Sequence, residues 1–90
     1  MSLDAAQKKK LKQEAHHLKP VIRVGQKGIS DTLIAETDAC LERHELIKVH
    51  VAAGERDERS ALAMDLVERT GAELVHTIGK VFILYRKKKD

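Results

Sequence analysis

The sequence is poor in aromatic residues and cysteine, and these shortages exclude several classes of protein. It contains no tryptophan, and Phe82 and Tyr85 are its only aromatic residues, whereas a platform that stacks successive bases needs several exposed rings. The single cysteine, Cys40, excludes an internal disulfide framework and a cysteine-rich zinc site. No apolar run approaches the roughly 20 residues of a membrane span, and the N-terminus lacks a signal-peptide core. We therefore expect a soluble, cytoplasmic protein with no membrane partner.

The length of the chain limits its architecture. A domain of 90 residues buries only about 60–65% of the surface that its unfolded chain exposes, so its apolar residues must share one core. We expect residues 1–90 to form one domain, with a core over about 3–86 and a basic tail over 87–90. No set of side chains has the spacing of a nucleophile with its base or of a metal site. The sequence thus predicts a monomer that is not an enzyme, with no cofactor, metal or small-molecule substrate.

Charge is unevenly distributed along the chain, although the net charge is only +3. Residues 1–28 carry seven basic and two acidic side chains, residues 29–85 carry six and eleven, and residues 86–90 carry four and one. The three segments therefore contribute +5, −5 and +3. This asymmetry suggests one face that meets a polyanion while the remainder keeps the chain soluble. A solvated helix with a basic tail is the simpler alternative.

The spacing of apolar residues indicates three helices. The first, over about residues 3–17, carries Leu11, Ala15 and Leu18 on one stripe and ends before Pro20. The second extends from an N-cap at Ser30 to about residue 44, and the third covers about residues 56–70. We expect the second helix to bury Leu33, Ile34, Thr37, Cys40 and Leu41, and the third to bury Leu62, Leu66 and Val67, with Met64 as a further candidate.

Short apolar runs rich in β-branched residues indicate four strands, at residues 21–24, 46–51, 74–78 and 81–85. Gly79 and Lys80 separate the last two runs, and a two-residue linker that contains glycine is typical of a hairpin. Gly71 follows the third helix, where a left-handed cap is common. The order α-β-α-β-α-β-β predicts an α/β fold with a four-stranded mixed sheet packed by helices. The last two strands should be antiparallel, with parallel or mixed neighbours elsewhere.

Residues 25–28, with the sequence Gly-Gln-Lys-Gly, lie between the first strand and the second helix. Their two glycines permit conformations that a Cβ would forbid and allow another backbone to approach closely. Backbone N–H groups at the positive end of the helix dipole favour a phosphate. Lys27 adds a cation at the loop tip, and Arg23, Lys19 and the first helix extend the positive field. The alternative is an ordinary turn. A dinucleotide or triphosphate loop is excluded, because the third glycine and the Gly-Lys-Ser/Thr ending are missing.

Five histidines and one serine invite other chemical interpretations. His16 and His17 are adjacent, so on a helix they point about 100° apart and do not readily share one ion. His44 is expected at a helix C-terminus, where the dipole favours it. Ser30 lacks a nucleophile-elbow pattern, and helix capping explains it. These residues therefore indicate neither a metal site nor a catalytic site.

Four separated segments of the chain resemble the CRM domain, whose name abbreviates chloroplast RNA splicing and ribosome maturation. They are residues 18–21 (Leu-Lys-Pro-Val), 24–29 (Val-Gly-Gln-Lys-Gly-Ile), 44–49 (His-Glu-Leu-Ile-Lys-Val) and 78–86 (Ile-Gly-Lys-Val-Phe-Ile-Leu-Tyr-Arg). The resemblance extends over about residues 5–86 with the elements in the same order. The stand-alone bacterial form of this family is the YhbY-type protein. Plant members join several such domains for intron splicing, so a single domain favours a ribosomal role.

This resemblance implies a fold similar to the C-terminal domain of bacterial translation initiation factor three. It also implies an RNA-binding Gly-x-x-Gly loop and a role, as a ribosome assembly factor, on ribosomal RNA of precursor large subunits. With few aromatic residues, recognition by shape and backbone is expected more than base stacking. Another structured RNA is one alternative, and an adaptor that docks on a ribosomal protein through the acidic helices is a second. The candidate RNA-contacting residues are Gly25, Gln26, Lys27, Gly28, Arg23, Lys19, Lys8, Lys9, Lys12 and Arg86.

Overall fold

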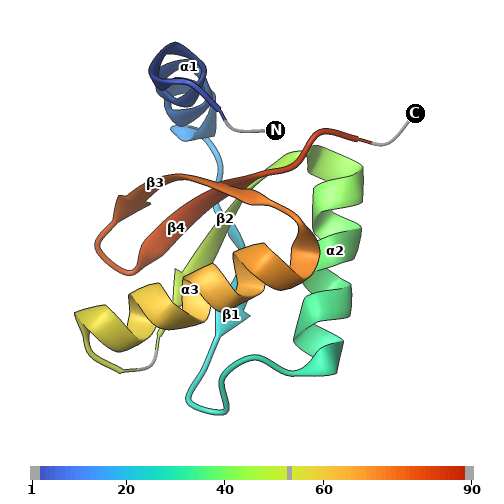
Figure 1. Ribbon diagram of the computed structural model, residues 1–90, viewed down its shortest axis with the longest axis vertical. Coiled ribbons are helices and arrows are strands. Elements are labelled where there is room, and N and C mark those ends of the chain that lie inside the picture. Colours follow the sequence, from blue (N-terminus) through green and yellow to red (C-terminus); the bar gives the residue numbers. More distant parts are fainter. Residues whose placement is uncertain (1–2, 53, 89–90) are drawn as a thin grey trace.

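The elements follow one another in the predicted order. A computed structural model describes residues 3–52 and 54–88, and in these ranges it contains three helices and four strands (Figure 1). Lys89 and Asp90, the end of the predicted basic tail, lie outside the described residues. The helices are α1 (Ala5–Ala15), α2 (Asp31–His44) and α3 (Arg56–Thr70), and the strands are β1 (Pro20–Val24), β2 (Leu46–Val51), β3 (Glu73–Ile78) and β4 (Val81–Tyr85).

The four strands form one mixed sheet in the order β1-β2-β4-β3. β1 and β2 pair in parallel, whereas β4 pairs antiparallel with both β2 and β3. The predicted mixed sheet and antiparallel last pair are thus confirmed. The connection through α3 does not join neighbouring strands, because β4 lies between β2 and β3. α1 lies on one face of the sheet and α2 and α3 lie on the other, which gives three layers (Figure 1).

Two apolar clusters hold these layers together. The larger one lies between the sheet and the α2–α3 layer, and Val49 and Val51 of β2 are fully buried in it. The smaller one joins Ala15 of α1 to Val75 and Ile83 on the opposite face. Because the side chains of a strand alternate between the two faces, both clusters draw on the same strands.

The ends of the helices follow from local hydrogen bonding. The Ser30 hydroxyl accepts a hydrogen bond from the backbone N–H of Leu33, so the predicted N-cap is confirmed. Gly71 ends α3 with a φ of 72°, the predicted left-handed cap. α1 begins two residues later than predicted, because Asp4 caps it and forms a reciprocal capping box with Gln7.

Two apolar residues lie outside the positions that their spacing predicted. Met64 is 43% exposed, because residue 64 lies about 100° around α3 from the buried stripe. Leu18 is 38% exposed, because α1 ends at Ala15 and the chain leaves the helical stripe. The expectation that Met64 is a candidate for burial is therefore wrong, and Leu18 does not continue the stripe of α1 as its spacing predicted. The stripe that α3 does bury consists of Ala63, Leu66, Val67 and Thr70.

Candidate nucleic-acid interface

The loop of residues 25–28 connects the C-terminal end of β1 to the N-terminus of α2. Gly28 has a φ of 74°, a conformation that side chains disfavour, and its N–H donates to the Gly25 carbonyl at 3.0 Å. A Cβ on Gly28 would lie 3.6 Å from a methyl of Leu62, so the loop packs against α3. Gln26 and Lys27 at the tip are exposed. The loop therefore presents its backbone and the Lys27 ammonium to solvent next to the positive end of α2.

The fold explains the glycine at one end of this loop but not the glycine at the other end. Gly28 needs its left-handed conformation, whereas Gly25 has no such φ, and a Cβ there would meet nothing within 4 Å. The isolated fold therefore gives no reason for glycine at position 25. Close approach of a bound molecule is a physical reason that would apply.

Three connections meet at the edge of the sheet where β1 and β2 end. Because these strands are parallel, the chain after β2 adjoins the loop, and the N–H of Ala52 donates to the Val24 carbonyl at 2.8 Å. β4 runs opposite to β2, so the β3–β4 hairpin reaches the same edge, and the N–H of Val51 donates to the Lys80 carbonyl at 2.9 Å. Lys80 is thus a second basic residue at this edge with Lys27, although its place in the sequence indicated only a turn.

Arg23 precedes the loop on the face of the sheet that α1 partly covers. Ile22 and Val24 are buried against the α2–α3 layer, so Val21 and Arg23 of the same strand point to the other face. Strand pairing places Arg23 beside His50 of β2. Arg23 is exposed and is separated from the loop by one residue. Its guanidinium is therefore placed to act together with Lys27.

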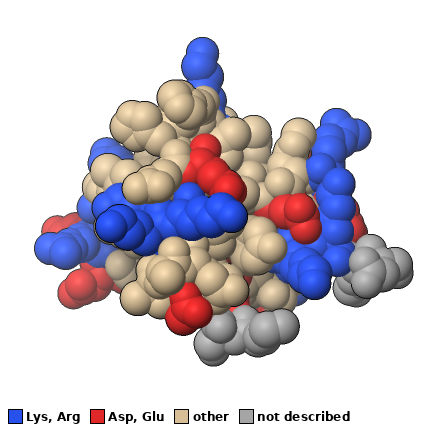
Figure 2. All heavy atoms as spheres, turned by 90° about the horizontal axis from the view of Figure 1, so that it is seen from above, with Lys and Arg blue, Asp and Glu red and all other residues tan. Residues whose placement is uncertain are grey.

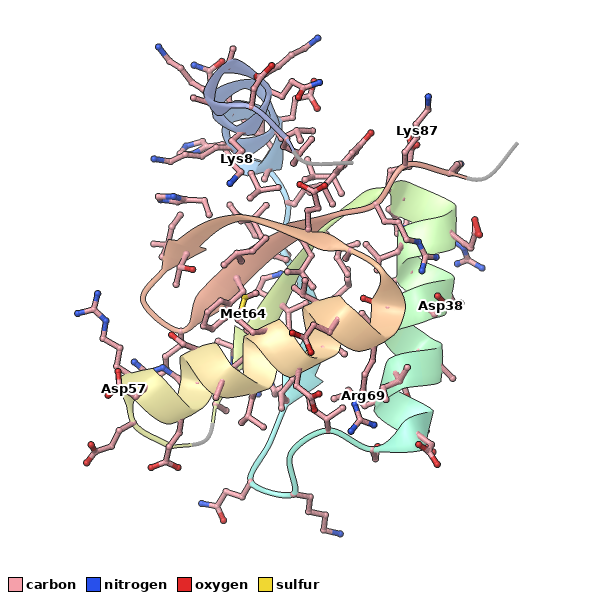
Figure 3. All side chains as sticks on the ribbon, in the orientation of Figure 1. Lys8, Asp38, Asp57, Met64, Arg69 and Lys87 are labelled. Atoms are coloured by element: carbon pink, nitrogen blue, oxygen red, sulfur yellow. The ribbon has the colours of Figure 1, made fainter. Side chains whose placement is uncertain are left out.

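The lysines of α1 form a second basic group, at the end of the molecule opposite to the loop (Figures 1 and 3). Lys8, Lys9 and Lys12 are exposed, and Lys9 and Lys12 line a groove with His16 and His17. The view from the α1 end shows Lys and Arg side chains in two separate groups, a strip at the centre left and a column at the right (Figure 2). The predicted site residues of the loop and of α1 thus form two groups and not one patch.

The connection from α1 to β1 bridges these two groups, and Lys19 lies in it, exposed. The longest extent of the molecule is 33 Å. A nucleic acid that contacts both the loop and the lysines of α1 must span most of this length, roughly nine stacked nucleotides at ~3.4 Å each.

Arg86 has its side chain directed into the protein, with a side-chain exposure of 14%. One terminal nitrogen donates to the Thr70 carbonyl at 2.7 Å and pairs with the Asp38 carboxylate, and the other donates to the Asp38 carbonyl at 3.1 Å. The guanidinium thus ties the C-terminal segment to the end of α3 and to α2. This is a structural role, and the exposed basic surface described above does not include Arg86.

Within residues 3–52 and 54–88, no cluster of three or more His, Cys, Asp or Glu side chains is arranged to hold a metal ion. No helix in the same ranges is both long enough and apolar enough to span a membrane.

The comparison with known protein families identifies the family of the chain. A family model of the CRS1/YhbY (CRM) domain matches residues 3–86. The chain belongs to this family. The resemblance carried by the four separated sequence segments is therefore confirmed, and the glycine loop occupies one of those segments.

Individual relatives resemble this CRM domain over nearly its whole length. A probable RNA-binding protein of Pseudomonas aeruginosa is 45% identical over 87 residues, which cover 97% of this chain and 84% of the relative. An RNA-binding protein of Haemophilus influenzae is 39% identical over 89 residues, with 99% and 90% covered. The solution structure of a Staphylococcus aureus protein described as a candidate RNA-binding protein matches with a TM-score of 0.86 at 39% identity, covering 99% of this chain and 93% of that one. The structural match confirms the predicted α/β fold.

Proposed function

We propose that this CRM domain binds RNA through the loop of residues 25–28, with Arg23 and Lys27 neutralising adjacent phosphates. The observation that carries the proposal is an exposed glycine loop at the N-terminus of α2, in a chain whose relatives are named for RNA binding. Backbone N–H groups at a helix N-terminus suit a phosphate oxygen, and flanking cations add attraction that does not depend on base sequence. Lys80, at the same edge, is suited to a neighbouring phosphate.

The α1 lysines and Lys19 extend this surface toward the other end of the molecule. Their contacts would set the position and orientation of the RNA and would carry no sequence information. A long, mostly electrostatic footprint of this kind is suited to a structured RNA, which proteins recognise largely by shape and backbone.

We further propose that the partner is ribosomal RNA of a precursor large subunit, and that the protein acts in the cytoplasm as an assembly factor. The four sequence segments that resemble the CRM domain support this role. The bacterial relatives also support it, because the match covers 84–90% of their own length and so leaves no room for a second such domain in them.

The sedimentation of the protein in cell lysate tests this assignment. On a sucrose gradient at low salt, we expect the tagged protein to migrate with free large subunits or their precursors. Moderately raised salt should release it to the top of the gradient, because counterions compete for the phosphates. A protein that stays at the top at both salt concentrations would contradict the ribosomal assignment, and a smaller RNA would then be the partner to seek.

A second candidate function is an adaptor that docks on a basic ribosomal protein through α2 and α3. Several acidic residues of these helices are exposed and lie on the face of the sheet opposite to α1. Protein-free ribosomal RNA distinguishes the two functions. Binding to it as tightly as to the whole particle argues against the adaptor, whereas binding only to the particle favours it. The acidic residues concerned are Glu36, Asp38, Glu42, Asp57, Glu58 and Glu68.

The glycine at position 25 provides a test of close contact with RNA. We expect Gly25→Ala to leave the melting temperature within a few degrees of the wild type, because the added Cβ meets nothing and φ is not strained. RNA affinity should nevertheless fall about tenfold, because the methyl group would hold the RNA backbone away from the loop. The measurement is fluorescence anisotropy with a labelled RNA. An unchanged affinity would show that no atom of the RNA approaches position 25.

A further inference from the structure

A groove of about 490 Å³ lies at the N-terminal end of β1, at the other end of this strand from the glycine loop. We propose that it holds one unstacked base of the RNA that the loop binds, and that it selects a base with an exocyclic amino group. This inference rests on the proposed function and deepens it, because it assigns base selection to a protein whose other contacts address the RNA backbone.

Strand pairing creates the groove. β1 begins opposite Lys48 of β2, so Leu46 and Ile47, at the start of β2, have no neighbour in β1. The connection from α1 and the C-terminal end of α2 frame the open space. The Lys48 ammonium donates to the Leu18 carbonyl at 3.0 Å and so fixes the connection beside the strand. The walls are therefore set by the fold and need no ligand to form them.

The lining of the groove combines apolar faces with polar groups. Leu18 and Val21, two of the four large apolar residues that the described chain exposes, lie in it with exposures of 38% and 51%. Such side chains suit the flat face of a nucleobase. Glu14, His17 and His44 surround them and offer hydrogen-bonding groups to the edge of the base. This arrangement of apolar walls with a few convergent polar groups is typical of small-molecule sites.

The chemistry of Glu14 determines which bases fit. An ionised carboxylate only accepts hydrogen bonds, and it pairs well with an exocyclic amino group such as that of cytosine. Uracil has a carbonyl oxygen where cytosine has its amino group, and its one donor, the N3–H, is flanked by two carbonyl oxygens that repel a carboxylate. The groove should therefore favour cytosine, adenine or guanine over uracil.

The charge around the groove points to RNA as the source of the base. Lys19 lies at the rim, and the neighbouring groove on α1, which shares His17, adds Lys9 and Lys12. Glu14 is the single carboxylate among the described residues that line these two grooves. A polyanion that carries bases is thus better matched than an uncharged small molecule or an acidic peptide.

The face of β1 connects the groove to the loop. Val21 lines the groove, and Arg23 points to the same side of the strand two residues nearer the loop. β1 has five residues, which span about 16 Å at ~3.3 Å each. At ~3.4 Å per stacked nucleotide, roughly five nucleotides bridge this distance. A single-stranded segment of about six nucleotides should therefore reach both sites.

Base preference in unpaired oligonucleotides tests the groove. We expect labelled 12-nucleotide oligo(C) and oligo(A) to bind the full chain about tenfold more tightly than oligo(U) in fluorescence anisotropy. Glu14→Gln should reduce this preference to less than about threefold, because an amide both donates and accepts and so tolerates uracil. Glu14 is exposed, so the substitution should not impair folding. A wild-type protein with no base preference would overturn the proposal.

A matched pair of substitutions tests the apolar wall. Val21→Asp should weaken oligo(C) binding about tenfold, whereas Met64→Asp, on a comparably exposed residue of α3, should change it less than twofold. Addition of oligo(C) should also shift the methyl NMR signals of Leu18 and Val21, because a base ring lies against them. Binding without methyl shifts, or equal effects of the two substitutions, would overturn the groove proposal.

These experiments distinguish a failure of the groove proposal from a failure of the proposed RNA binding by the loop. If oligonucleotides bind in a salt-dependent manner and Arg23→Glu with Lys27→Glu abolishes this binding, the proposed function stands whatever the groove does. If the oligonucleotides bind in this way but show no base preference and no methyl shifts, only the proposal that the groove holds a base is overturned. If no oligonucleotide binds even at low salt, the groove proposal falls, whereas the loop proposal falls only if structured ribosomal RNA also fails to bind.

Discussion

Replacement of both Arg23 and Lys27 with glutamate is expected to lower RNA affinity at least a hundredfold without unfolding the protein. Both side chains are exposed, so neither substitution disturbs the core. A hydrogen bond to a charged group contributes about 1.5–3 kcal/mol, so the loss of two contacts corresponds to about 3 kcal/mol or more, roughly two factors of ten. The introduced carboxylates also repel the phosphates. Fluorescence anisotropy measures the affinity, and circular dichroism checks the fold.

The control must reproduce the change in net charge. Each Arg→Glu or Lys→Glu substitution lowers the charge by two, so Arg43→Glu with Arg69→Glu takes the chain from +3 to −1, as the loop variant does. Arg43 and Arg69 are exposed near the C-terminal ends of α2 and α3. We expect this control to weaken binding less than tenfold. Equal losses in the two variants would show that net charge, and not the loop, governs binding.

Salt dependence gives a second measurement on the same variant. If about five phosphates are neutralised, log K should fall with log salt at a slope near −3.5 for single-stranded RNA. Loss of two of these contacts should make the slope less steep by about 1.4. An affinity of the wild type that does not change with salt would contradict the phosphate contacts on which the proposed function rests.

The second large effect concerns stability. Arg86→Met is expected to lower the free energy of unfolding by about 2–3 kcal/mol, because it leaves the Thr70 carbonyl without its donor and removes the hydrogen bonds to Asp38. The ion pair with Asp38 adds less, since 54% of the Asp38 side chain is exposed and solvent screens the attraction. In a domain of this size the loss corresponds to a melting temperature roughly 10–20 °C lower. Thermal unfolding followed by circular dichroism measures it.

Arg69→Met is the matched control for this prediction. Arg69 pairs with Asp65 at 3.0 Å, one helical turn away on the exposed surface, and such pairs contribute only about 0.3–0.5 kcal/mol. Arg86→Lys should be intermediate, because one ammonium cannot reproduce the planar fork of donors. If Arg86→Lys weakened RNA binding while the melting temperature stayed unchanged, Arg86 would contact RNA and the structural role assigned to it would be wrong.

The elements of the fold were predictable where their signals are local. Ser30 and Gly71 mark helix ends by the chemistry of one or two neighbouring residues, and both positions are confirmed. The burial of single residues near helix ends was less predictable. Leu18 continues the spacing of α1, but Asp4 and Gln7 set the start of the helix and the chain leaves it at Ala15, so the stripe ends earlier than the spacing indicates.

The residues of the candidate site also differ in how far the sequence could predict them. The glycine loop follows from a short motif between a strand and a helix, and sequence analysis found it. The positions of Lys80 and the groove depend on which strands pair, and this pairing joins residues about 30 positions apart. The partners of Arg86 lie 16 and 48 positions away in the chain. No local pattern contains such contacts, so the basic character of Arg86 alone suggested a role in RNA binding.

The order of strands in the sheet has a consequence for how the protein is made. β4 comes last of the strands in the chain but lies inside the sheet, between β2 and β3, and supplies Phe82 and Leu84 to the main core. During synthesis the first three strands therefore leave the ribosome before the strand that joins β3 to β2. Until Val81 and its successors emerge, β3 has no partner and β2 is paired only with β1, and unpaired strand edges are prone to pair with other chains. The nascent chain should thus reach its native state late in translation, in one step that depends on contacts distant in sequence.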